Sequence, residues 1–126
     1  MKVLFAIAVG GAVGALGRHS VDMLTLRWLG AGFPYGTLTV NVLGSFLMGA
    51  LIEVMALRWS VGPEVRALLS VGVLGGFTTF STFSLDFVVL VERGQLGTAL
   101  GYAALSFSLS IFGLFAGLWL FRTILA

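Results

Sequence analysis

The sequence contains little charge and no cysteine. Charged side chains make up 10% of its 126 residues, whereas an ordinary soluble domain has about 25%. This shortage excludes the usual water-soluble surface. The absence of cysteine excludes a disulfide framework and a thiolate metal centre. A formal net charge of only +2 without a basic stripe also argues against a nucleic-acid partner.

Apolar residues are what the sequence has in abundance, at 59% of the chain. A transmembrane helix needs about 20 apolar residues in a row. The chain has room for four such spans, which we place at about residues 3–28, 36–57, 66–91 and 97–121. No length remains for a soluble domain, so the sequence predicts an all-α membrane protein with one four-span domain over residues 1–126.

The third of these spans contains an unusual stretch, Gly75-Gly76-Phe77-Thr78-Thr79-Phe80-Ser81-Thr82-Phe83. Adjacent glycines and β-branched threonines weaken a helix. We therefore predict that the third helix is broken at its centre. Non-helical backbone at membrane depth is tolerated only where it is buried in protein or lines a polar cavity. The break thus suggests a binding or permeation site near the bilayer midplane.

The basic residues are spread almost evenly over the two ends of the predicted bundle. In a four-span chain, one side carries Lys2, Arg58, Arg66 and Arg122, and the other carries Arg18, Arg27 and Arg93. Orientation normally follows an excess of Lys and Arg on the cytoplasmic side. So small an excess predicts insertion both ways up, and hence an antiparallel, dual-topology homodimer. The alternative is a single orientation set by one dominant charge.

The central parts of the spans offer neutral hydrogen-bond donors and no ionisable group. Such donors can replace the hydration shell of a small anion without trapping it. Each has a simpler interpretation: a hydroxyl that bonds the carbonyl four residues earlier, an asparagine that joins two helices, or a phenylalanine that only packs. The candidate residues are Asn41, Thr79, Ser81, Thr82, Ser106 and Ser110, with the aromatic ring edges of Phe77, Phe80 and Phe83.

Two other functions fit a four-span chain. A small proton-coupled antiporter for cationic compounds would need a membrane-embedded carboxylate, for which Glu53 is the only candidate in the first two spans. Towards a span end, Glu53 and Asp86 can instead reach the interface or pair with a nearby arginine. A non-transporting helper subunit would be held together by small-residue patterns such as Gly113-x-x-x-Gly117.

The sequence contains three motifs: Gly11-x-x-Gly14-Ala15-x-x-Arg18, Gly36-Thr37-Leu38-x-Val40-Asn41-x-x-Gly44-Ser45-Phe46-x-x-Gly49, and the third-span stretch from Gly75 to Phe83. Together they resemble a known family, the Fluc (CrcB-type) fluoride channels. The resemblance covers essentially the whole chain.

The resemblance implies a non-enzymatic channel in the cell (plasma/inner) membrane of a prokaryote. Such a channel lets cytoplasmic fluoride leave passively and so confers resistance to fluoride. It implies an antiparallel homodimer in the lipid bilayer with two fluoride pores, and a sodium ion at the dimer interface. The implied pore residues are Asn41, Phe80, Phe83, Ser81, Thr82, Ser106 and Ser110; the sodium is held by backbone carbonyls of Gly75 and Thr78, and Arg18 belongs to the vestibule.

Overall fold

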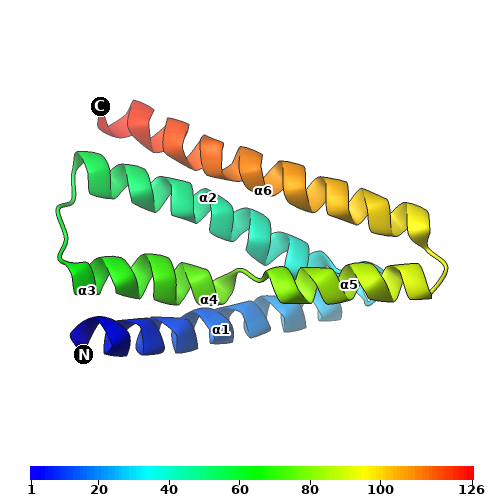
Figure 1. Cartoon of the computed structure of the whole chain (residues 1–126). Coiled ribbons are helices and arrows are strands. Elements are labelled where there is room, and N and C mark those ends of the chain that lie inside the picture. The colour runs from blue at the N-terminus through cyan, green and yellow to red at the C-terminus, as the bar shows by residue number, and fades with distance from the viewer.

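The chain is a bundle of long helices. A computed structural model describes all residues, 1–126, and four helical segments in it are long and apolar enough to cross a membrane. Figure 1 shows their order: α1 (Lys2–Leu29), α2 (Tyr35–Leu57), a third span from Pro63 to Glu92, and α6 (Leu96–Leu125). The all-helical, four-span prediction is confirmed.

The third span consists of several consecutive helical pieces. They are α3 (Pro63–Arg66), the π-helix η1 (Ala67–Leu74), α4 (Gly75–Phe77) and α5 (Phe80–Glu92). A π-helix of eight residues is unusual, because π-helical turns generally occur singly and often near functional sites. Nothing in the sequence predicted it.

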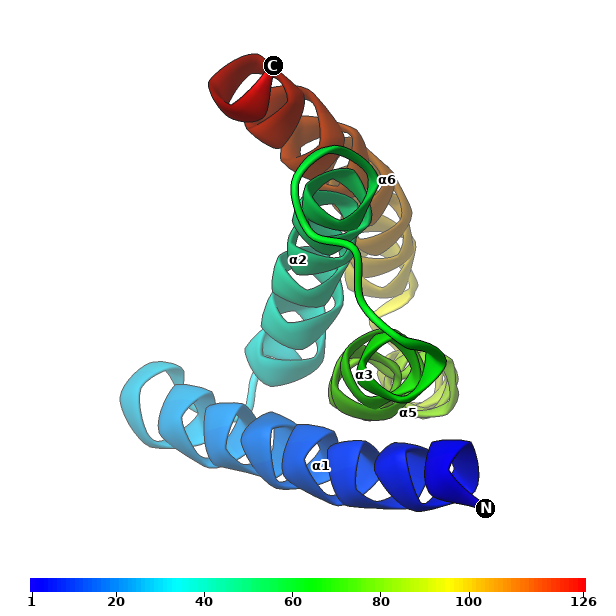
Figure 2. The same ribbon diagram turned by 90° about the vertical axis from the view of Figure 1, so that its left-hand side faces the viewer.

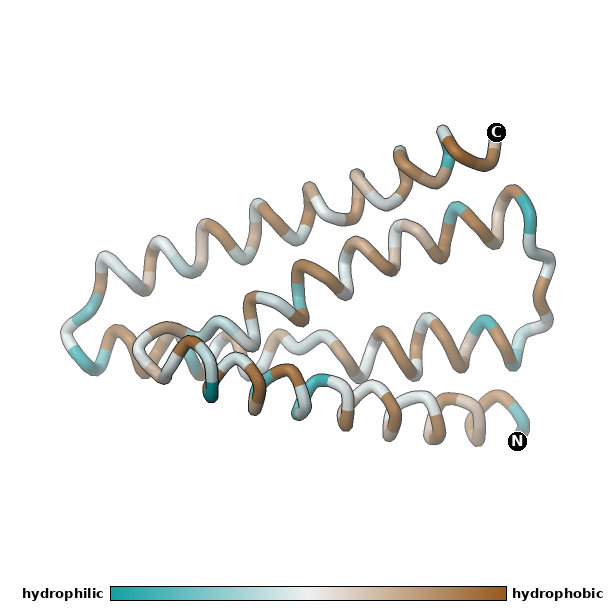
Figure 3. The backbone as a smooth tube through the Cα atoms, turned by 180° about the vertical axis from the view of Figure 1, so that it is seen from behind, coloured by the Kyte–Doolittle hydropathy of each residue, from teal (hydrophilic) through white to brown (hydrophobic).

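Both chain termini lie at the same end of the bundle as the α2–α3 connection, and the two other connections lie at the opposite end (Figure 1). Hydrophilic residues gather mostly at these two ends, whereas the spans between them are largely apolar (Figure 3). This distribution is the one a bilayer requires, since its hydrocarbon core is about 30 Å thick.

Glycines bring the helices into backbone contact in two places. α2 packs along α6, where a Cβ at Gly117 would lie 2.8 Å from the Ala50 nitrogen. α1 packs on η1 and α4, where a Cβ at Gly10 would lie 2.9 Å from the Gly72 Cα. Figure 2, seen along the bundle, shows α1 crossing beneath the third span while α2 lies beside α6. Small residues at such crossings let two backbones approach closely.

The buried core is small. Only 18 of 126 residues are buried, and the one core cluster consists of Leu90, Ala99 and Tyr102. Large apolar side chains instead cover the outside of the bundle. A single copy therefore presents an apolar surface suited to lipid or to another protein chain, and its packing is concentrated where helices cross.

Candidate functional site

Two residues in the middle of the third span have extended backbone. Thr78 has φ −87° and ψ 156°, and Thr79 has φ −152° and ψ 126°. Thr79 caps the helix that follows, because its hydroxyl accepts a hydrogen bond of 3.2 Å from the Thr82 backbone N–H. The glycines before them remain helical, since α4 covers Gly75–Phe77. The extended backbone thus falls on the threonines, whereas the glycines, which were expected to weaken the helix as well, remain helical.

Asn41 on α2 holds the interrupted backbone from the side. Its Nδ2 donates to the Thr79 carbonyl at 3.0 Å, and its Oδ1 accepts from the Thr79 N–H at 2.8 Å. These are backbone groups that no water can satisfy inside a bilayer. Asn41 therefore joins two helices, as one of the simpler interpretations expected. A side-chain amide has two N–H groups, so Asn41 still has a second N–H to offer.

A cavity of about 290 Å³ lies beside this interruption. We call it the midspan cavity. It brings together five of the predicted pore residues, which come from α2, α5 and α6: Asn41, Phe80, Phe83, Ser106 and Ser110. The rings of Phe80 and Phe83 lie side by side, with centroids 5.5 Å apart. No charged side chain lines the cavity. The cavity is also lined by Thr79, another of the hydroxyl donors considered from the sequence, and by four residues that sequence reasoning did not assign to the pore: Ser45, Thr78, Phe107 and Ile111.

The hydroxyl of Ser106 is the unusual group in this cavity. Ser106 is 7% exposed, and its Oγ has no hydrogen-bond partner in the protein. Ser45, in the same cavity, donates to the Asn41 carbonyl at 2.6 Å and so bonds back along its own helix. A buried polar atom without a partner costs free energy unless something else satisfies it. Ser106, which lines the cavity, therefore carries a buried hydroxyl without a hydrogen-bond partner in the protein.

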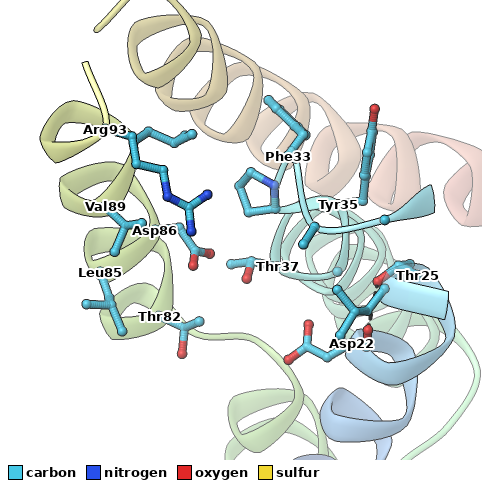
Figure 4. Close-up of a pocket in the computed structure, with 17 residues that line it drawn as sticks. Asp22, Thr25, Phe33, Tyr35, Thr37, Thr82, Leu85, Asp86, Val89 and Arg93 are labelled. Carbon is cyan, nitrogen blue, oxygen red and sulfur yellow. Dashed lines mark hydrogen bonds between the residues drawn. The ribbon is translucent and has the colours of Figure 1, made fainter. Parts of the chain in front are cut away.

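A second cavity, of about 320 Å³, lies at the end of the bundle that holds the α1–α2 connection. We call it the loop-end cavity. Figure 4 shows Thr37, Thr82 and the carboxyl groups of Asp22 and Asp86 around it, together with Arg93. This cavity is polar and charged where the midspan cavity is neutral, and it opens where the chain would meet water.

Tyr102 of α6 connects the surroundings of the two cavities. It is completely buried, and its hydroxyl donates to Asp86 Oδ2 at 3.1 Å. Its ring packs on Phe83 with a centroid distance of 5.2 Å. Sequence reasoning missed Tyr102 as a site residue. The available signal was a tyrosine four residues before Ser106, which places both on one helix face.

The other predicted site residues lie outside the midspan cavity. Thr82 lines the loop-end cavity. Ser81 is exposed, and its Oγ lies 3.4 Å from the Thr79 hydroxyl. Gly75 is exposed too. Arg18 is half-buried and donates from its Nε to the Gly76 carbonyl at 3.2 Å, so it lies at the depth of the interruption and outside the lining of both cavities.

Glu53 differs from the neutral residues of the midspan cavity because it is charged and paired with an arginine. Its carboxylate accepts a hydrogen bond from Arg122 Nε at 2.8 Å and is nearly buried, while Arg122 is mostly exposed. This is the arginine pairing expected for a carboxylate near a span end. Glu53 lines neither cavity, and the midspan cavity is lined by no carboxylate.

The sequence matches a known protein family and several of its members. The family model described as "CrcB-like protein, Camphor Resistance (CrcB)" matches residues 5–118. The chain is 55% identical over 126 residues to the "Fluoride-specific ion channel FluC" of Rhodospirillum centenum, with both chains covered in full. It is 54% identical over 125 residues to the protein of the same name in a Chelativorans species, covering 99% of this chain and 100% of that one. A third relative of that name, from Phenylobacterium zucineum, is 47% identical over 127 residues and is also covered in full.

Proposed function

This chain belongs to the CrcB family, and we propose from that membership and from the midspan cavity how it works as a fluoride channel. It is a fluoride-specific ion channel, not an enzyme, and it crosses the plasma membrane of a prokaryote several times. The observation that carries the mechanism is the buried Ser106 hydroxyl, which has no protein partner in a cavity without charge.

The midspan cavity supplies donors of moderate strength to a small anion. Ser106 and Ser110 contribute hydroxyl groups, and Asn41 contributes its second amide N–H. The ring edges of Phe80 and Phe83 carry partial positive charge and add weaker contacts. Because no lysine or arginine lines the cavity, the anion is not held by a full charge. Conduction requires this balance, since binding must favour entry and still permit exit.

The direction of transport follows from chemistry outside the protein. Fluoride enters a cell as neutral hydrofluoric acid and is trapped as the anion in the less acidic cytoplasm. A membrane potential that is negative inside drives a monovalent anion outward with about 2.3 kcal/mol per 100 mV. A passive pore is sufficient for export, so no energy-coupling site is needed.

A second copy of the chain completes the pore. Phe80 and Phe107 line the midspan cavity, although they are 78% and 72% exposed in the single copy. The cavity is therefore open on that side, and polar groups facing lipid would be unfavourable. A second copy packed there would close the cavity, and twofold symmetry would give two pores in each homodimer. Ser81, which is exposed, would then face the partner, while Thr82 belongs to the loop-end approach to the pore.

The two copies would be antiparallel. Four Lys and Arg residues flank the spans at one end of the bundle, and three flank them at the other. The second number falls to two if Arg18 is left out because it contacts Gly76. Neither difference is a strong bias, so neither orientation is strongly preferred. An axis in the membrane plane would place the two interrupted third spans beside each other.

A structural sodium ion fits the same arrangement. The extended backbone of Thr78 turns its carbonyl out of the helical direction, and Gly75 is exposed one turn before it. A hard cation prefers oxygen ligands. The carbonyls of Gly75 and Thr78 from two copies would hold sodium at the dimer interface and neutralise the negative end of each α4 helix.

Two alternatives weighed on sequence grounds receive no support. The antiporter needs a free carboxylate, and Glu53 is paired with Arg122. A helper subunit without transport would have no reason to bury the unpaired Ser106 hydroxyl beside Asn41.

The test is purified protein in liposomes loaded with fluoride or chloride, with a potassium ionophore to balance charge. We expect fluoride efflux, retention of chloride, and loss of fluoride efflux in Phe80→Ile. Absence of fluoride efflux in the wild type, or chloride efflux at the same rate, would contradict the proposal.

The dimer is tested separately. The chain has no cysteine, so a single cysteine added at the C-terminus can be labelled from one side of sealed vesicles. An antiparallel dimer predicts that half of the label sites are accessible in cross-linked dimers. Dimers that are labelled at both sites or at neither would contradict it.

A further inference from the structure

Arg18 contacts the third span at the end of α4. Its Nε donates to the Gly76 carbonyl at 3.2 Å across 58 positions of sequence. Gly76 is the last residue but one of α4. The last carbonyls of a helix have no partner within it and carry the negative end of its dipole. A cationic donor is well suited to this position, and the guanidinium supplies both the hydrogen bond and the charge.

The sequence of α1 brings Arg18 to this place. Gly10, Gly14 and Arg18 follow one another at intervals of four, so they share one face of the helix. The glycines on this face lie against the backbone of the third span: a Cβ at Gly14 would be 2.8 Å from the Phe77 nitrogen. One turn beyond this contact, the arginine side chain reaches the carbonyl of Gly76.

The interruption is thus held by another helix on each of its two sides. Asn41 of α2 binds both backbone groups of Thr79, and Arg18 of α1 binds Gly76. Thr78, between them, bonds only within the third span, from its N–H and its hydroxyl to the Leu74 carbonyl. Removing the side chain of Asn41 or of Arg18 would leave the end of one helical piece of the third span free to move.

We propose that Arg18 is a positioning residue for ion conduction, which fixes the end of α4 and thereby the placement of Thr78 and Thr79 in the midspan cavity. This rests on the proposed channel function. Arg18 lines neither cavity, so it acts through Gly76 and does not touch the ion. The competing role is attraction of anions by a positive charge near the pore entrance.

Three substitutions separate the two roles. Arg18→Gln places an amide nitrogen at the same number of bonds from the backbone as Nε and keeps the donor without the charge. Arg18→Met places a methyl group there and removes both. Arg18→Lys keeps the charge on a longer stem. Positioning predicts that Met lowers fluoride flux at saturating fluoride by about tenfold or more, and that Gln recovers a substantial part of the loss.

Ionic strength gives an independent readout. The flux is measured again in about 1 M of an impermeant salt, where the Debye length is about 3 Å. A positioning defect persists at high salt. If Arg18 instead attracts anions, the loss of flux disappears at high salt and at saturating fluoride. Where the loss is seen, Arg18→Lys is then as active as wild type, and Arg18→Gln is as weak as Arg18→Met. The second pattern would overturn the proposal.

A spectroscopic signal follows the contact itself. The sequence contains only two Gly-Phe pairs, Gly32-Phe33 and Gly76-Phe77. Protein labelled with carbonyl-¹³C glycine and ¹⁵N phenylalanine gives one correlated NMR signal for each pair. We expect Arg18→Met to shift the Gly76 carbonyl signal and leave Gly32 unchanged, and Arg18→Gln to restore the shift in large part. An unchanged Gly76 signal in Arg18→Met would overturn the proposal even if flux fell.

Failure of the channel function would look different. In that case the wild type itself would release no fluoride, while the Gly76 signal would still report whether Arg18 holds α4. The Gln and Lys variants keep the comparison decisive if Arg18→Met does not fold.

Discussion

Adding one methyl group at Gly14 should uncouple α1 from the interrupted third span. A Cβ there would lie 2.8 Å from the Phe77 nitrogen and closer still to the Val73 carbonyl oxygen. Favourable contacts between heavy atoms begin at about 3.5 Å. The two backbones must therefore separate by at least about 0.7 Å, the difference between these values. Both obstacles are backbone atoms, which cannot turn aside as a flexible side chain can.

The size of the effect follows from this displacement. Overpacking of a well-packed contact costs about 1–3 kcal/mol. A misplacement of about 1 Å can lower the rate of a positioned reaction by roughly a hundredfold. We expect Gly14→Ala to lower fluoride flux by about tenfold or more and to lower the melting temperature in detergent.

The matched control is the neighbouring Gly11→Ala. A Cβ at Gly11 would meet nothing within 4 Å, and alanine is the better helix former by about 1 kcal/mol. Gly11→Ala should keep its flux and its melting temperature, or raise the latter. If Gly14→Ala matched Gly11→Ala in both fluoride efflux and melting temperature, the close contact would not matter, and the reasoning would be refuted.

Three further substitutions test the site. Ser106→Ala should abolish most fluoride flux without lowering the melting temperature, because the hydroxyl has no protein partner to lose. The control Ser108→Ala, on the exposed surface, should change neither the flux nor the melting temperature. A lower melting temperature in Ser106→Ala would indicate a structural role instead. Asn41→Asp should remove flux, since a carboxylate cannot donate to the Thr79 carbonyl; normal efflux from this variant would exclude the pairing as a requirement. Glu53→Gln should leave fluoride flux unchanged because its partner is Arg122, and a cation-transport activity lost in Glu53→Gln would favour the antiporter.

The four spans could be predicted from the sequence because apolar length alone determines them. The position of the interruption could be predicted only in part. Two glycines and two threonines marked the region, but Gly76 is helical and lies against α1, where a Cβ would be 2.8 Å from the Gly11 oxygen. The glycines serve close packing, and the threonines carry the extended backbone. Local propensity does not distinguish these uses, because the distinction depends on which helix lies alongside.

The midspan cavity divides the predicted pore residues along helical periodicity. Successive residues of an α-helix are about 100° apart, so Phe80 and Phe83 share a face while Ser81 and Thr82 point elsewhere. This separation was available from the sequence, and the structure shows it, with Phe80 and Phe83 in the cavity and Thr82 in the loop-end cavity. The pore role of all seven residues, Ser81 and Thr82 included, stays a prediction.

The pairing of Asn41 with Thr79 could not be predicted, because it joins residues 38 positions apart. The sequence offered two roles for Asn41, a ligand or a link between helices, and its two N–H groups allow both at once. The π-helix from Ala67 to Leu74 was equally invisible, since half of its residues, one alanine and three leucines, are good α-helix formers. Both features depend on tertiary packing, which overrides local preference.

These observations assign an indirect importance to α1. None of its residues lines the midspan cavity. Its glycine face nevertheless packs against the third span up to the interruption, and Arg18 binds the last helical turn before the interruption. We therefore expect the geometry of Thr78 and Thr79 to depend on the distance between the two backbones at Gly14. Substitutions on this face of α1 should alter conduction without altering the chemistry of the pore, whereas substitutions on its lipid-exposed face should not.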